Sequence, residues 1–135
     1  MPAFRETVVC DAAPTAVWRI VHDPERFSEW MVDTERVEAG DDEGTVVRYL
    51  HGLPDFPMPT RVESRAEGGR VVISCLVSDI DLRVSLTPEG AGCGVEIAVT
   101  IPEGEAHREE AMRELVTASL ARLAERAAAE GPPLG

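Results

Sequence analysis

Apolar and polar residues alternate along several short segments of this chain, with the period of two that is typical of half-buried strands. Leu82, Val84 and Leu86 alternate with polar neighbours, and residues 94–101 repeat the pattern with valine and isoleucine. Residues 60–66 follow it with smaller side chains. Each such strand has one apolar and one polar face, so the pattern indicates an antiparallel sheet that is covered on one side.

Clusters of turn-forming residues divide this pattern into seven expected strands. The connections are short from the second strand onward, which indicates an antiparallel meander. Three prolines fall within residues 52–59. Because proline cannot donate to a sheet ladder, we expect this segment not to be a central strand. The expected strands cover residues 4–10, 33–39, 45–51, 60–66, 70–78, 79–87 and 94–101.

Helical patterns mark two further regions. Residues 14–31 are expected to form two short helices end to end, because Pro14 suits the first position of a helix and Asp23 can cap a second one. Residues 106–129 are expected to form one long helix, followed by a disordered tail at 130–135. The apolar stripe of the long helix consists of Met112, Val116, Ser119, Leu120, Leu123 and Ala127.

Two tryptophan-bearing segments carry a resemblance to a known family. They are AAPTAVW, which ends at Trp18, and DPERFSEW, which ends at Trp30. Together with the order of elements, they resemble the START/birch-pollen-allergen-like (SRPBCC) superfamily, and within it the small bacterial polyketide cyclase/dehydrase-type proteins. The resemblance implies one domain over residues 1–135 with an α+β, helix-grip fold. In that fold a seven-stranded antiparallel sheet curves around the long C-terminal helix, with two short helices between strands 1 and 2.

The resemblance also implies a binding site, because such proteins hold apolar molecules between the concave face of the sheet and the terminal helix. Small residues on the helix stripe either let helix and sheet approach closely or leave room for a ligand. Trp30 lies either at the floor of this hollow or in the core, where Trp18 is also expected. Phe56 and Met58 form either a gate or an ordinary rigid loop. The expected lining residues are Trp30, Tyr49, Val62, Ser64, Cys75, Leu82, Val84 and Ile97.

Residues 45–51 hold the candidates for catalysis. Tyr49 and His51 share one face of the expected strand. If that face is the concave one, they place two groups that can exchange protons at the cavity wall. Arg48 lies on the opposite face, and a register shift of one residue exchanges the two sets. Aromatase/cyclases, which the chain resembles, line their pockets with arginine, tyrosine and tryptophan, so an inward Arg48 could polarise an enolising carbonyl. The alternative is a hydrogen-bonded edge tyrosine and an exposed histidine without catalytic roles.

The charge balance narrows the range of partners. The net charge is −12, and all 13 basic residues are arginine. Nucleic acid and anionic membrane surfaces are disfavoured, because both bind basic surfaces. No segment approaches the roughly 20 apolar residues of a membrane span, and the N-terminus lacks the apolar core of a signal peptide, so we expect a cytoplasmic protein. The excess carboxylates either keep a small protein soluble or attract a cationic partner.

Cysteine and histidine show no pattern of a metal site or of a catalytic thiol. The three cysteines and three histidines show no metal-ligand spacing, and we expect neither metal nor cofactor. Cys10 and Cys75 fall inside apolar strands, whereas Cys93 is expected in a hairpin turn. An odd number of cysteines argues against a disulfide framework, and the absence of a nearby base argues against a catalytic thiol.

These observations lead to two functional hypotheses. The first is a protein that binds a small hydrophobic molecule, polyketide-like or lipid-like, with cyclase or dehydrase activity as an open question. The second is a non-catalytic protein of the same fold, which binds another protein or sequesters a ligand as a resistance or carrier protein. Both are compatible with a monomer or a homodimer.

Overall fold

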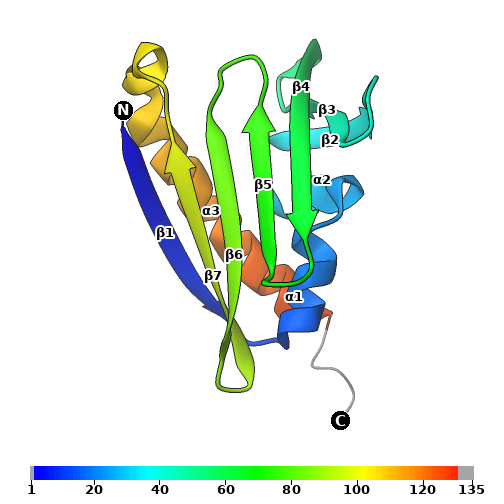
Figure 1. Ribbon diagram of the computed structural model, residues 1–135, viewed down its shortest axis with the longest axis vertical. Coiled ribbons are helices and arrows are strands. Elements are labelled where there is room, and N and C mark those ends of the chain that lie inside the picture. Colours follow the sequence, from blue (N-terminus) through cyan, green and yellow to red (C-terminus); the bar gives the residue numbers. More distant parts are fainter. Residues whose placement is uncertain (1, 131–135) are drawn as a thin grey trace.

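A seven-stranded antiparallel sheet wraps around one long helix in the computed structural model, which describes residues 2–130 (Figure 1). The strand order is β1-β7-β6-β5-β4-β3-β2, so the six strands from β2 to β7 form the expected meander and β1 joins its end. The strands are β1 (Ala3–Cys10), β2 (Thr34–Ala39), β3 (Thr45–Leu50), β4 (Leu53–Arg65), β5 (Arg70–Cys75), β6 (Asp81–Glu89) and β7 (Gly92–Thr100).

The two short helices lie between β1 and β2, as the sequence predicts. Proline is the first residue of α1 (Pro14–Val21) and of the 3-10 turn η1 (Pro24–Arg26), which leads into α2 (Phe27–Trp30). The carboxylate of Asp23 caps η1 by accepting the Glu25 N–H at 3.0 Å. The predicted second helix therefore starts as a 3-10 turn, and its α-helical part is one turn long.

The terminal helix α3 (Glu109–Ala129) packs its predicted stripe against the sheet and the helix pair. All six stripe residues are buried, which confirms the apolar periodicity. The Ser119 hydroxyl accepts the backbone N–H of Val32 at 3.2 Å, so this small residue fastens α3 to the segment after α2. The helix begins later than residue 106, because residues 103–108 form the 3-10 turn η2 (Glu103–Arg108).

Two positions differ from the expectation: the fourth strand begins at Leu53 and not at Thr60, and Cys93 lies in a strand. The proline-rich segment is the first half of β4, where Met58 and Pro59 pair with Arg48 and Val47 of β3. The ladder between β4 and β5 begins only at Thr60, so the prolines lie where β4 pairs with β3 alone. A backbone N–H that proline lacks is therefore not required there for a ladder with β5. Cys93 does not lie in a turn. It lies in β7, buried opposite Cys10 of β1.

Burial governs the chemistry of these two thiols. Burial raises the pKa of the Cys10 thiol to about 11, and the neighbouring Cys93 adds to the shift. Both cysteines are free and both act as small apolar side chains of the core.

Of the expected tail at 130–135, residues 131–135 lie outside the described residues, and Glu130 is an ordered ion-pair partner of Arg26.

An ion-pair cluster joins the helix pair to the end of α3. Arg26 contacts Glu29 at 2.9 Å and Glu130 at 2.6 Å, and Arg126 contacts Glu29 at 2.7 Å. The hydrogen bond from Arg26 lowers the pKa of Glu29 to about 2 and also lowers the pKa of Glu130. This cluster holds the C-terminal end of α3 against α2, at the opposite end of α3 from η2.

Candidate functional site

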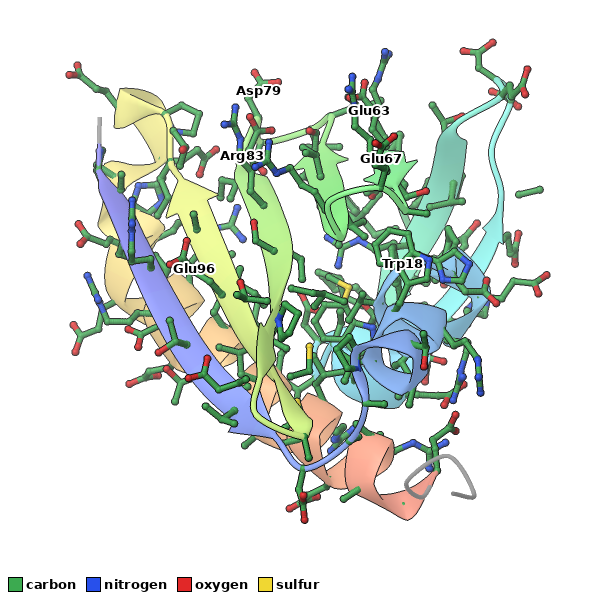
Figure 2. All side chains as sticks on the ribbon, turned by 60° about the horizontal axis from the view of Figure 1, so that its bottom comes forward. Trp18, Glu63, Glu67, Asp79, Arg83 and Glu96 are labelled. Carbon is green, nitrogen blue, oxygen red and sulfur yellow. The ribbon has the colours of Figure 1, made fainter. Side chains whose placement is uncertain are left out.

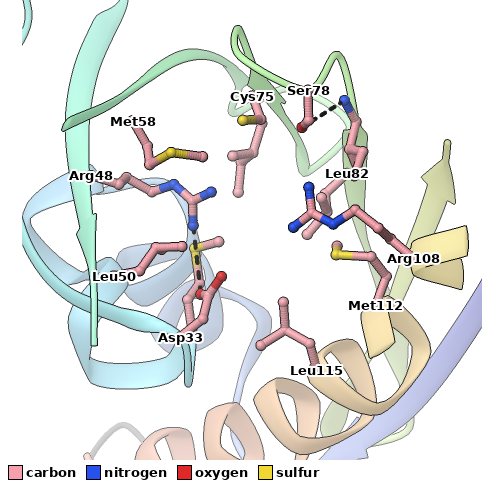
Figure 3. Close-up of a pocket in the computed structure, with 13 residues that line it drawn as sticks. Asp33, Arg48, Leu50, Met58, Cys75, Ser78, Leu82, Arg108, Met112 and Leu115 are labelled. Atoms are coloured by element: carbon pink, nitrogen blue, oxygen red, sulfur yellow. Dashed lines mark hydrogen bonds and ion pairs between the residues drawn. The ribbon is translucent and has the colours of Figure 1, made fainter. Parts of the chain in front are cut away.

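A cavity lies between the concave face of the sheet and the first turns of α3 (Figure 3). The sheet contributes residues from β3, β4, β5 and β6, and the β5–β6 loop closes one side. Arg108 approaches from the end of η2 and Met112 from the first turn of α3, and Met31 and Asp33 approach from the segment between α2 and β2. The full lining is Met31, Asp33, Arg48, Leu50, Met58, Ile73, Cys75, Ser78, Ile80, Leu82, Arg108, Met112 and Leu115.

Methionine is concentrated at this cavity. Met31, Met58 and Met112 all line it, and they are three of the four methionines in the chain. Their side chains are unbranched and polarizable, so they adapt to differently shaped neighbours. The cavity therefore has apolar walls that can move without disturbing the backbone.

Arg48 is the buried charged group of the cavity and is only 7% exposed. Its Nη1 donates to the Thr34 hydroxyl at 3.0 Å and lies 3.6 Å from Oδ1 of Asp33. Its Nε donates to the Thr60 hydroxyl at 3.3 Å. Nη2 has no hydrogen-bond or ion-pair partner among residues 2–130, and Figure 3 shows this nitrogen turned toward the cavity.

The register of β3 decides between the two candidate sets. Arg48 pairs with Met58 of β4, and both side chains point to the concave face together with Leu50. Tyr49 therefore points to the convex face, where the guanidinium of Arg36 lies 3.8 Å from the centre of its ring. His51 follows the strand with an exposed side chain, 3.9 Å from Glu35.

The other expected lining residues divide into three groups. Cys75 and Leu82 line the cavity, whereas Val84 and Ile97 belong to the closed core beside it. Val62 and Ser64 lie further along β4, away from the cavity; Val62 packs against the core and Ser64 is exposed. Of these six residues, only Cys75 and Leu82 therefore line the cavity.

Trp30 is fully buried in the core and does not line the cavity. Its ring meets Phe27 edge to face, with centroids 6.2 Å apart. Its Nε1 is a buried donor without a hydrogen-bond partner among the described residues. The structure thus places Trp30 as an anchor of α2.

Several lining residues were missed in the sequence. Arg108 faces Arg48 across the cavity and pairs with Glu105 at 3.7 Å (Figure 3). Asp33 stands at the expected start of β2, and Met31 ends the second helix; neither position shows from its neighbours which way it points. The sequence places Met112 on the buried stripe of α3, and this position indicates that Met112 faces the sheet across the cavity.

The cavity is small and chemically simple. Its volume is about 40 Å³, enough for one or two water molecules. Its titratable side chains are two arginines, Asp33 and Cys75, so it offers positive charge for a developing oxyanion but no histidine or tyrosine. Among residues 2–130 no group of three histidine, cysteine or carboxylate side chains could hold a metal ion. Within that range none of the helices combines the length and apolar character that a membrane span needs.

Several solved structures share the fold of this chain. The di-domain ARO/CYC BexL, from the BE-7585A biosynthetic pathway, superposes with a TM-score of 0.78 at 16% identity over 93% of this chain. The chain spans 46% of that protein's length. A protein of Thermobifida fusca aligns over 100% of this chain and 99% of its own, with a TM-score of 0.75 at 18% identity. A protein of Thermus thermophilus covers 96% of this chain and 99% of its own, with a TM-score of 0.73 at 19% identity.

Sequence comparison gives the family. No curated protein sequence matches the chain. Residues 1–129, nearly the whole chain, match the family described as polyketide cyclase/dehydrase and lipid transport. The curved seven-stranded sheet, the helix pair after β1 and the long C-terminal helix agree with this match. The chain therefore belongs to the polyketide cyclase/dehydrase and lipid transport family.

Proposed function

We propose that the protein binds a small apolar molecule carrying a carbonyl or enol oxygen, with its body between sheet and α3 and its oxygen on Arg48. The observation that carries this proposal is a buried guanidinium with one nitrogen, Nη2, left for a ligand beside the apolar side chains that the sheet contributes. Burying a charge is costly unless its hydrogen bonds are made. A ligand oxygen at Nη2 would add the missing partner.

The cavity must widen to accept such a molecule. A volume of about 40 Å³ is far below the roughly 300 Å³ at which ligand pockets begin. Rotation of Met58 and Met112 is the cheapest way to gain space, because both side chains line the cavity and are flexible. We therefore expect binding to reshape the side chains and leave the strands in place.

Any reaction would depend on holding the ligand in a folded shape. Arg48 could stabilise the negative charge that develops on a carbonyl oxygen during enolisation. Asp33 is the carboxylate beside it, but it already accepts from Thr34 and pairs with Arg48. Cyclase or dehydrase activity would thus come mainly from proximity and orientation of the reacting carbons. The family description and the ARO/CYC neighbour support a polyketide-like ligand, and the same family description supports a lipid-like one.

The proposal is tested by calorimetric titration with emodin, a phenolic anthraquinone. The unmutated protein should bind one molecule in the Arg48 cavity, and Arg48→Met should bind at this site about tenfold to a hundredfold more weakly, since a hydrogen bond to a charged group contributes roughly 1.5–3 kcal/mol. Arg83→Met is the matched control, because Arg83 is exposed on the convex face and forms no ion pair with residues 2–130.

Two results would overturn this assignment. Equal affinities of the unmutated protein and a folded Arg48→Met variant would remove Arg48 from the site. No binding of emodin or of a fatty acid would favour the alternative in which a non-catalytic protein of this fold binds another protein. In that case the exposed apolar side chains of Leu53, Phe56, Leu76 and Val77 would become the leading candidates for contact with another protein.

A further inference from the structure

A second concave site lies at the other end of the sheet, between α1, the β4–β5 turn and the end of β6. Its walls are Pro14 and Trp18 on α1, Ala66 and Gly69 in the turn, and Leu86 and Pro88 on β6. Ala66 lies eight positions after Met58 of the first cavity, and β4 spans nearly all of this interval, which is about 25 Å of extended chain. The groove is therefore distinct from the cavity with Arg48.

Lack of charge distinguishes this groove. None of its lining side chains is ionisable, although charged residues make up 28% of the chain. Its volume of about 510 Å³ lies within the range of small-molecule sites and far exceeds that of the first cavity. An ionic ligand would lose its hydration there without gaining a partner, so the groove suits an uncharged molecule.

Trp18 gives the groove a fixed aromatic wall. The sequence predicts Trp18 in the core, but it is only half-buried, and it extends from α1 toward the sheet (Figure 2). Its ring stacks on His22 at 5.1 Å with an interplanar angle of 7°, and Nδ1 of His22 lies 2.7 Å from the Trp18 carbonyl oxygen. The indole is thus held in place before any ligand arrives, which lowers the entropic cost of binding.

The opposite wall is backbone rather than side chain. Gly68 and Gly69 have φ values of +89° and +60°, which other residues rarely adopt. A Cβ on Gly69 would come within 3.2 Å of Cβ of Leu86, whereas a Cβ on Gly68 would meet nothing within 4 Å. The turn therefore packs closely on β6 at Gly69 and leaves open space at Gly68, which lines the same groove as the Trp18 indole.

We propose that this groove is a second binding site, which takes an uncharged planar aromatic molecule beside the Trp18 indole. The proposal does not depend on the function proposed for the Arg48 cavity. It assigns to the α1 end of the fold a site that accepts rings without an anionic group.

The test uses naphthol, an uncharged two-ring probe, and the indole N–H signals of the two tryptophans in a nitrogen-labelled protein. Naphthol should shift the signal of Trp18 and leave that of the buried Trp30 in place. Ala66→Phe, which fills the groove, should weaken the binding at least tenfold. Arg65→Phe, with its side chain on the convex face, is the matched control and should bind as the unmutated protein does.

A third variant separates the two sites. Cys75→Leu fills the Arg48 cavity and should leave the Trp18 response unchanged, even if it abolishes emodin binding. Independently of any variant, nuclear Overhauser contacts should connect naphthol to the Leu86 methyl groups. An unshifted Trp18 signal at saturation, full affinity in Ala66→Phe, or contacts only to Met58 and Leu115 would overturn the proposal.

Discussion

At the scale of residues, single polar side chains fix how the apolar layers meet. Arg48 connects β3 to β4 through Thr60, and to the start of β2 through Thr34. Ser119 connects α3 to Val32. Each is buried, and each makes hydrogen bonds that are costly to leave unmade.

Ser119→Ala should therefore destabilise the fold. The substitution leaves the Val32 N–H without its acceptor, and a lost buried hydrogen bond costs roughly 1–2 kcal/mol. The free energy of unfolding from urea titration measures the loss. Thr117→Ala is the control on the same helix, because Thr117 is exposed, and it should change stability by less than about 0.5 kcal/mol. Equal effects of the two substitutions would contradict this role of Ser119.

The residue scale is also where the sequence was least informative about the site. Alternation along residues 45–51 shows that Arg48 and Tyr49 face opposite ways, but either face could be inward because valine or leucine flanks both. Pairing of Arg48 with Met58 decides the matter, and that contact depends on the path of the proline-rich segment. Arg108 escaped notice because it precedes the helix stripe, within η2.

At the scale of elements, α3 is fixed by different forces at its two ends. Near η2 it lines the cavity with Met112 and Leu115, and this end must adjust if a ligand enters. At its other end, the cluster of Arg26, Glu29, Arg126 and Glu130 holds it to α2. Arg113 also holds the η2 end to Glu6 of β1 at 3.1 Å, so we expect a ligand to move the side chains of Met112 and Leu115 and not the helix itself.

Glu29 gives this cluster a dependence on pH. Its pKa of about 2 in the folded protein lies below the ordinary value of 4.5, so its contribution to stability is present above about pH 4.5 and is lost as the pH falls toward 2. Glu29→Gln should lower the free energy of unfolding at pH 7 by about 1 kcal/mol, a typical contribution of a partly exposed ion pair. The difference between the two proteins should vanish near pH 2.

Urea titrations of both proteins across this pH range provide the measurement. Glu114→Gln serves as control, because Glu114 is exposed on the same helix and forms no ion pair with residues 2–130. A Glu29→Gln deficit that is constant from pH 7 to pH 2 would show that the substituted side chain acts through packing and not through its charge.

Elements were the level that the sequence predicted best. The alternating strands, the short connections and the buried stripe of α3 are all confirmed, since each follows from a repeat in the chain itself. The proline-rich part of β4 was missed, because pairing on one side only depends on where the neighbouring strand β5 ends. The same limit explains Cys93, whose position in β7 depends on the length of the β6–β7 hairpin.

At the scale of the whole molecule, the fold provides two concave sites of different chemistry along one sheet. The cavity near η2 combines two arginines with adaptable methionines, and the groove near α1 combines a fixed indole with an uncharged surround. The sequence predicted a hollow under the sheet through its resemblance to the SRPBCC superfamily. It could not predict the volume of that hollow, because volume depends on how side chains from distant segments pack together.

A ligand that enters the methionine-lined cavity and places its oxygen on Arg48 must change the surroundings of the methionine methyl groups. The nuclear magnetic resonance signals of these groups during titration with emodin therefore test the proposed binding mode. We expect large shifts for Met31, Met58 and Met112, and no such shifts in Arg48→Met at the same emodin concentration. Bound emodin that leaves these three methyl signals unmoved would exclude binding in this cavity.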